Sequence, residues 1–291
     1  MKPAAFDYRR PESLDEALDL LAELGDEARV LAGGQSLVAL LNMRLARPAL
    51  VVDIGRLADL ADVARCGPRL VIGSRVTHRA VETAAAHPDF AGYEVLPRTA
   101  RLIGHLPIRT RGTFGGSVAH ADPAAEWPLL ARLLDAEMVL GRRGGERRVA
   151  SADYFQSFLT TATEPGELLL RVELPRPPHA AALVEFAPRR GDFAVVAVAV
   201  ALDLSPDGVC TSARIAVGGV DSVPLRVPEA EAALAGVRLG AGPLAEAARV
   251  AAASVDPLGD AHASPAYRRR LVAALTERAF DEAVGPWPQA A

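Results

Sequence analysis

The first third of the chain alternates between the apolar spacings that predict helices and strands. Leu14, Leu18 and Leu21 recur at helical spacing after a capping-box pattern that begins at Ser13, and Gly25 ends that helix. Short apolar runs bounded by turn residues predict strands. The predicted elements are helices over 14–24 and 37–45, the second capped by Ser36, and strands over 30–32 and 50–54. This order indicates a small α/β unit.

The second block, residues 57–175, continues this mixture but contains one stretch without regular spacing. The predicted elements are strands over 70–72, 136–140 and 167–174, a helix capped by Thr77, a helix over 94–103, and a helix that Asp122-Pro123 begins and that continues to Leu134. Residues 104–122 are rich in Gly, Thr and Arg and are expected to be irregular. Two arginine pairs, 142–143 and 147–148, flank a Gly-Gly turn and predict a solvated hairpin.

The sequence Pro175-Arg176-Pro177-Pro178 is the clearest boundary in the chain, because it cannot continue a strand ladder. The predicted elements after it are strands over 181–187, 193–204 and 213–220, then helices over 228–234, 243–254 and 265–283. Strands followed by helices predict an α+β layer of sheet and packed helices. The apolar run 194–202 is much shorter than the ~20 residues of a membrane-spanning helix and indicates a buried strand.

Composition excludes several classes of protein. The formal net charge of −4 over 291 residues argues against binding of nucleic acid through electrostatic attraction. Cys66 and Cys210 are too few for a disulfide scaffold or an iron–sulfur cluster, which needs about four ligands. Lys2 is the only lysine, which excludes a phosphate loop of the Walker type and a Schiff-base enzyme. Because residues 1–10 contain no apolar leader, the expected compartment is the cytoplasm.

Two glycine loops are the strongest candidates for chemistry. In the first, Gly33-Gly34 lies between a predicted strand and a predicted helix, so its backbone can approach a ligand closely and free amides can point at a phosphate. In the second, Gly115-Gly116 lies between Thr113 and Ser117, whose hydroxyls can donate to an anion. Each loop alone is more often a tight turn. Together they predict that two backbone amide nests from separate lobes close around the pyrophosphate of one dinucleotide.

Other polar residues carry weaker signals. The six histidines show no metal-ligand spacing, and most of them are expected to be surface or capping residues, so no metal site is predicted. No GxSxG sequence supports acyl transfer, and no GxGxxG sequence supports an ordinary dinucleotide fold. No side chain is therefore proposed as a catalytic acid, base or nucleophile.

Three segments resemble the FAD-binding medium subunit of the molybdenum hydroxylases, with the carbon monoxide dehydrogenase medium-chain type as the nearest match. They are AGGQSL (32–37), RTRGTFGGSVAHADPAAEWP (109–128) and RRGDFA (189–194). The resemblance extends over essentially the whole chain, from FDYRRPESLDEAL (6–18) to the C-terminal domain. It implies an α+β protein with a flavin domain of the PCMH or vanillyl-alcohol-oxidase type over 1–176, made of subdomains 1–56 and 57–176. A C-terminal domain over 179–286 combines a small antiparallel sheet with helices.

The same resemblance implies which residues bind FAD. The first loop would wrap the diphosphate through Leu31, Ala32, Gly33, Gly34, Gln35, Ser36 and Leu37, and the second through Thr113, Gly115, Gly116 and Ser117. His120, Asp122 and Glu126 would lie near the ribityl or adenosine hydroxyls. Leu168 and Leu169 would pack close to the adenine or the flavin, and Phe193 would approach the isoalloxazine edge. Xanthine dehydrogenase relatives place a lysine beside the flavin after a Phe, whereas here Ala187 and Pro188 follow Phe186.

The resemblance also implies an electron path. A molybdopterin large subunit would oxidise the substrate, an iron–sulfur small subunit would carry the electrons, and FAD in this chain would pass them to a quinone or NAD. The assembly would be a dimer of heterotrimers. Two alternatives stay open at this stage: a self-sufficient FAD oxidoreductase that acts directly on a small organic substrate, and a non-catalytic assembly subunit.

Overall fold

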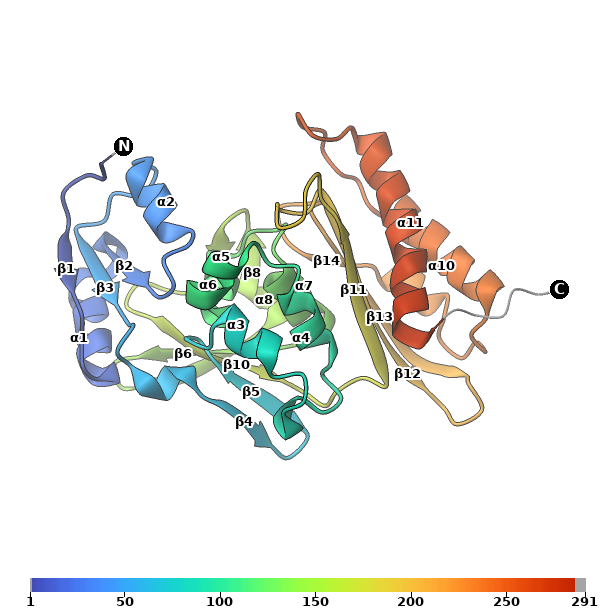
Figure 1. The fold of residues 1–291 in the computed structure, drawn as a ribbon, viewed down its shortest axis with the longest axis horizontal. Coiled ribbons are helices and arrows are strands. Elements are labelled where there is room, and N and C mark those ends of the chain that lie inside the picture. Colours follow the sequence, from blue (N-terminus) through green and yellow to red (C-terminus); the bar gives the residue numbers. More distant parts are fainter. Residues whose placement is uncertain (1, 286–291) are drawn as a thin grey trace.

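The computed structural model describes residues 2–285 and places three units side by side (Figure 1). The N-terminal subdomain lies at one end, the second subdomain in the middle, and the C-terminal sheet with its helices at the other end. Residue 286, the last of the predicted C-terminal domain, lies outside the described residues. Within residues 2–285, the structure contains no helix that is both long enough and apolar enough to cross a membrane.

The N-terminal subdomain is the predicted α/β unit. A parallel sheet has the strand order β1 (Asp7–Arg9), β3 (Leu50–Asp53), β2 (Ala28–Leu31), with helices α1 (Leu14–Leu24) and α2 (Leu37–Asn42). The cap of α1 is confirmed, because the Ser13 hydroxyl accepts from the Glu16 amide and Gly25 ends the helix at a φ of +50°. The predicted cap of α2 is wrong: the Ser36 side chain makes no capping hydrogen bond.

The second subdomain is a five-stranded antiparallel sheet with helices on one face. Its strand order is β4 (Val63–Cys66), β5 (Arg69–Gly73), β10 (Leu168–Leu174), β6 (Glu137–Arg142), β7 (Gly145–Ala150). Val172 and Leu174 are buried on the helix side, whereas Glu173 on the other side pairs with Arg148 and Arg171. The β6–β7 pair confirms the predicted hairpin. The smaller elements are α3 (His78–Thr83), α4 (Val95–Ala100), α8 (Ser151–Tyr154), β8 (Phe155–Ser157) and β9 (Thr160–Thr161).

The stretch 104–122 was expected to be irregular, and this prediction is wrong. It forms two short helices, α5 (Leu106–Arg111) and α6 (Phe114–His120). The Thr113 hydroxyl caps α6 by accepting from the Gly116 amide at 3.0 Å, and Phe114 is fully buried. The predicted helix start at Asp122-Pro123 is also wrong, because Asp122 forms a turn with Ala124. The next helix, α7 (Glu126–Leu133), begins four residues later than Asp122.

The C-terminal domain confirms the predicted sheet-then-helix order. The antiparallel sheet contains β11 (Ala180–Phe186), β12 (Val196–Leu204), β13 (Cys210–Gly218) and β14 (Leu225–Arg226), and is followed by α9 (Pro228–Ala232), α10 (Ala241–Ser254) and α11 (Pro265–Val284). The sheet is buried on both faces. Along β12, Val198 and Val200 belong to the core under α10 and α11, whereas Ala199 and Ala201 belong to the core of the second subdomain.

Candidate functional site

The two glycine loops touch, although they come from different subdomains. A Cβ atom on Gly33 would lie 2.2 Å from the carbonyl oxygen of Arg111 and 2.6 Å from Cα of Gly112. A Cβ atom on Gly116 would lie 3.8 Å from Cβ of Ala32. The backbone of the first loop therefore packs directly against the backbone that leads into α6. The predicted convergence of the two loops requires such a contact. Only glycine fits at position 33.

The first loop keeps its amides available. Gly34 has a φ of +74°, which turns the chain between β2 and α2. Within residues 2–285, the amides of Gly34, Gln35 and Ser36 donate to no backbone or side-chain acceptor. The Gln35 side-chain amide folds back onto the Gly33 carbonyl at 3.0 Å. Successive amides that face one way form a nest for an anion such as a phosphate.

The second loop does not form a second amide nest, so that part of the prediction is wrong. The amide of Phe114 donates to Val76, that of Gly115 to Ser74, and those of Gly116 and Ser117 to Thr113. The bonds to Ser74 and Val76 fix the loop against the turn that follows β5. What the second loop offers to a ligand is the hydroxyl of half-buried Ser117.

Ser74 adds a polar group that the sequence did not single out. A Cβ atom on Gly115 would lie 2.4 Å from Cβ of Ser74, so the two residues are pressed together. Within the described part of the chain, the buried Ser74 hydroxyl has no hydrogen-bond partner. An orphaned donor beside a glycine cradle, together with the free amides of the first loop, fits a phosphate-bearing ligand.

The buried side chain of His78 packs against this junction. His78 Nδ1 accepts a hydrogen bond from the Trp127 indole at 2.9 Å, and a Cβ atom on Gly112 would lie 2.6 Å from His78 Nε2. Burial lowers the pKa of His78 to about 4, so the ring is neutral at pH 7. Phe114 packs on Trp127 with ring centroids 4.7 Å apart. His78 is therefore a core residue, whereas most of the histidines are expected at the surface or in caps.

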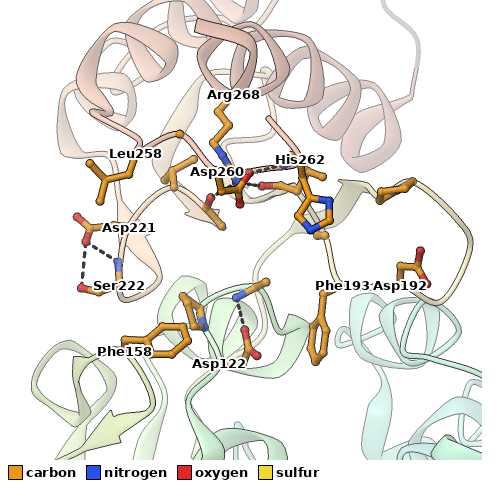
Figure 2. A pocket seen from close by; sticks show the side chains of 18 of the residues that line it. Asp122, Phe158, Asp192, Phe193, Asp221, Ser222, Leu258, Asp260, His262 and Arg268 are labelled. Carbon is orange, nitrogen blue, oxygen red and sulfur yellow. Dashed lines mark hydrogen bonds and ion pairs between the residues drawn. The ribbon is translucent and has the colours of Figure 1, made fainter. Parts of the chain in front are cut away.

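A cavity of about 980 Å³ lies beyond the C-terminal end of α6, between the second subdomain and the C-terminal domain (Figure 2). Asp122 and Phe193, both predicted from the sequence, line it together. Asp122 and Phe158 approach from the second subdomain, whereas Asp260 and Arg268 approach from the C-terminal helical layer. Helix α6 thus begins at the glycine junction and leads to Asp122 at the cavity.

The predicted polar residues near α6 occupy different environments. His120 is half-buried at the end of the helix, and burial lowers its pKa. The Asp122 carboxylate accepts from the Ala124 amide at 2.9 Å. Glu126 is buried at the start of α7, where desolvation and the nearby carboxyl of Glu185 raise its pKa to about 8. Desolvation also raises the pKa of Glu185 to about 7.

Leu168 and Leu169 lie apart from the cavity. Each is 4% exposed, and they belong to two different cores, Leu168 to that of the N-terminal subdomain and Leu169 to that of the second subdomain. Neither lines the cavity. Sequence reasoning also missed the C-terminal cavity residues, such as Asp221 and Asp260, because no local motif surrounds them.

Comparison with known families covers nearly the whole chain. Residues 4–177 match the FAD binding domain in molybdopterin dehydrogenase, and residues 181–283 match the CO dehydrogenase flavoprotein C-terminal domain.

Similar proteins support the same assignment. The chain is 39% identical to the 6-hydroxypseudooxynicotine dehydrogenase complex subunit alpha of Paenarthrobacter nicotinovorans, over 98% of this chain and 96% of the relative. It is 37% identical to the carbon monoxide dehydrogenase medium chain of Afipia carboxidovorans, over 97% of this chain and 98% of the relative.

Solved structures agree in fold. A chain of quinoline 2-oxidoreductase from Pseudomonas putida 86 superposes with a TM-score of 0.90 at 37% identity, over 96% of this chain and 97% of that chain. A chain of the Cu,Mo-CO dehydrogenase superposes with a TM-score of 0.91 at 36% identity, over 97% of this chain and 99% of that chain. The chain therefore belongs to the FAD-binding subunits of the molybdopterin dehydrogenases: it is a flavoprotein subunit of a multi-subunit oxidoreductase, and FAD is its cofactor.

Proposed function

We propose that this chain accepts electrons from iron–sulfur clusters on a small partner subunit and passes them through FAD to an external acceptor, a quinone or NAD. A molybdopterin large subunit would carry the substrate site, and two heterotrimers would pair. We place this assembly in the cytoplasm. The observation that carries the proposal is the backbone contact between the loops at Gly33 and Gly112, beside amides that have no acceptor in the described chain.

Different residues at the junction would bind different parts of the cofactor. The diphosphate would bind to the amides of Gly34, Gln35 and Ser36. The rest of the loop around it would be formed by Leu31, Ala32, Gly33 and Leu37. Gly115 and Gly116 let the second loop pack closely against its neighbours, and Thr113 holds the loop by capping α6. The hydroxyl of Ser117 would donate a hydrogen bond to the diphosphate. His120, Asp122 and Glu126 would receive ribityl or adenosine hydroxyls.

The chemistry belongs to the cofactor when it is bound, because FAD joins one-electron centres to two-electron acceptors. The contribution of this chain is to bind and orient the cofactor. Phe193, at the cavity, would limit access of water to the isoalloxazine edge. Leu168 and Leu169, which are buried in β10, would pack close to the adenine or the flavin.

The molybdenum subunit, and not this chain, would select the substrate. Relatives named for 6-hydroxypseudooxynicotine, carbon monoxide and caffeine are 39%, 37% and 36% identical to this chain. Such similar flavoprotein subunits serving chemically unrelated substrates indicate that the flavoprotein does not select among them.

The test is flavin uptake and assembly. The chain is expressed with riboflavin, alone and together with an iron–sulfur small subunit and a molybdopterin large subunit. We expect one FAD per chain by absorbance and co-elution of the three subunits. A correctly folded chain, judged by circular dichroism, that stays colourless and takes up no FAD would contradict the proposal.

A further inference from the structure

Two carboxyl groups without a cationic partner lie at the interface between the second subdomain and the C-terminal domain. Glu126 begins α7 and is 9% exposed. Glu185 lies on β11 and is half-buried, and its Oε2 atom is buried without a hydrogen-bond partner within residues 2–285. In the same part of the chain, no arginine or lysine pairs with either carboxyl. Because a buried charge without a partner is unfavourable, the surroundings favour the neutral forms of both groups.

The register of the C-terminal sheet places Glu185 on the face that covers α7. Glu185 lies opposite Ala197 of β12, which lies opposite Gly218 of β13, and residues directly opposite each other point to the same face. A Cβ atom on Gly218 would lie 3.1 Å from the carbonyl oxygen of Pro123, in the turn that precedes Glu126. Ala197 belongs to the apolar core that contains the buried side of α7. The side chain of Glu185 therefore points toward the start of α7, where its charge acts on Glu126.

The neighbouring elements supply no positive charge to this pair. Their titratable and charged groups are His120 at the end of α6, Asp122 in the turn before α7, Arg98 on α4, and Arg189 and Arg190 in the loop after β11. Burial lowers the pKa of His120, so its ring is neutral at pH 7 and above. The charge of Asp122 raises the pKa of Glu126 further. The three arginines are exposed and, among the described residues, lower the pKa of neither carboxyl.

Another buried carboxyl of this chain shows the effect of cationic partners. Glu173 on β10 is 6% exposed, but Arg148 donates to its carboxylate at 2.6 Å and Arg171 at 3.1 Å. Desolvation alone would raise its pKa, yet these hydrogen bonds lower the pKa to about 2. By contrast, desolvation raises the pKa of Glu185 to about 7, and desolvation together with the charge of Glu185 raises that of Glu126 to about 8. Glu185 thus ionises first, and its charge then helps Glu126 to keep its proton.

We propose that Glu126 and Glu185 form a carboxyl pair that holds a proton across this interface at neutral pH, and that Glu185 is a positioning residue for the cofactor site. It acts through Glu126, by keeping that carboxyl neutral. This inference rests on the proposed function, which assigns Glu126 to ribityl or adenosine hydroxyls of FAD. A neutral carboxyl can both donate to and accept from such a hydroxyl, and it adds no negative charge beside the anionic cofactor.

Infrared spectroscopy of the flavin-free chain tests the pair directly, because a protonated carboxyl has a C=O band that a carboxylate lacks. Between about pH 6 and about pH 9, we expect the parent to lose this band in two steps. Glu185→Gln should leave one step, shifted to lower pH because the neighbouring charge is gone. Glu126→Gln should leave the earlier step alone. Glu173→Gln is the matched control: this buried carboxyl is already ionised, so both steps should stay. A parent without this pH-dependent band would overturn the proposal.

Flavin titration over the same pH range tests the effect on the cofactor. We expect the affinity of the parent for FAD to fall roughly five-fold as the pH rises through 8, because Glu126 becomes charged. Glu126→Gln should keep its affinity, whereas Glu185→Gln should lose affinity at a lower pH than the parent. Identical pH profiles in the three proteins would overturn the positioning role. A correctly folded chain that takes up no FAD at any pH would instead contradict the proposed function, and the infrared bands would still decide whether the pair holds a proton.

Discussion

At position 33 a single methyl group decides whether the two loops can meet. The Gly33 Cα faces the carbonyl of Arg111, and there is no flexible side chain that can move aside, because the neighbouring atoms are backbone. A larger residue must therefore separate the first loop from the second. The glycine at this position serves close approach of two backbones rather than an unusual φ angle.

We predict that Gly33→Ala reduces the affinity for FAD by at least about ten-fold and lowers the free energy of unfolding by roughly 1–3 kcal/mol, because the loops are forced apart. Flavin fluorescence titration and urea unfolding measure the two effects. Gly242→Ala is the matched control: nothing lies within 4 Å of its added Cβ. It lies inside α10, so its stability should be unchanged or higher. Equal effects of the two substitutions would contradict this account.

The buried carboxyl of Glu126 predicts a pH effect on stability. Its pKa in the folded chain is about 8 against an ordinary value of 4.5, so the folded state holds a proton that the unfolded state releases. The contribution of Glu126 to stability is fully present below pH 4.5 and is lost as the pH rises through 8. In the flavin-free chain, we expect Glu126→Gln to be more stable than the parent at pH 8.5 by about 1–3 kcal/mol, and equal to it near pH 4.5.

Urea unfolding across this pH range measures the difference. Exposed Glu23 on α1 provides the control, because Glu23→Gln should show no such dependence on pH. A Glu126→Gln variant less stable than the parent at pH 8.5 would mean that the folded chain favours the ionised carboxyl.

Residue types could be predicted better than residue environments. The two glycine loops were identifiable from the sequence because close approach needs glycine. The free amides of 34–36 and the engaged amides of 114–117 were not distinguishable from the sequence. The acceptors for Phe114 and Gly115 are Val76 and Ser74 in another segment, and those for 116 and 117 depend on how Thr113 caps α6.

At the scale of elements, a hydrogen bond between α3 and α7 supports the second loop. His78 stands at the start of α3 and Trp127 near the start of α7, and the ring of His78 supports Gly112. Removing the indole donor leaves a buried acceptor without a partner, which costs about 1–3 kcal/mol.

We predict that Trp127→Phe destabilises the chain by about 1–3 kcal/mol and weakens FAD binding several-fold, because the support of Gly112 is loosened. Thermal unfolding and flavin titration measure these effects. Phe90→Leu is the control, since Phe90 belongs to the same core but lies in the 3-10 turn Pro88–Phe90, outside both glycine loops. Loss of stability in both variants with unchanged flavin binding in Trp127→Phe would refute the positioning role.

Long periodic elements followed from the sequence, whereas short ones did not. Helix α1 was predicted with its cap because Leu14, Leu18 and Leu21 mark one face over the length of the helix. Helices α5 and α6 were missed because Gly, Pro and Thr disfavour helix locally, and tertiary packing of Phe114 outweighs that preference.

For the whole molecule, the second subdomain and the C-terminal domain share one apolar core. Leu183, Ala199 and Ala216 of the C-terminal sheet belong to the same cluster as Trp127 and Leu129. The linker at 175–178 is thus a boundary in sequence, but the units on either side bury apolar surface against each other.

We predict that a fragment ending at residue 176 aggregates, because the apolar face that covers α7 is removed. Size-exclusion chromatography with light scattering checks this against the full chain. A monodisperse, folded fragment with native flavin affinity would show that the shared core is dispensable.

The cavity itself was beyond prediction from the sequence. Asp122, Asp192, Asp221 and Asp260 lie in four segments that only the packing of the two units brings together. Each segment has an ordinary local role as a turn or loop, so no spacing rule connects them.

The alternation of valine and alanine along β12 restricts how this strand can change in length. Inserting one residue within it would reverse the facing of the residues that follow, so that valines point toward α7 and alanines toward α11. The interface with α7 would then be overpacked, and the interface with α11 would contain cavities. Inserting two would restore the original arrangement. This inner strand can therefore lengthen or shorten only by even numbers of residues if the packing on both faces of the sheet is to be kept.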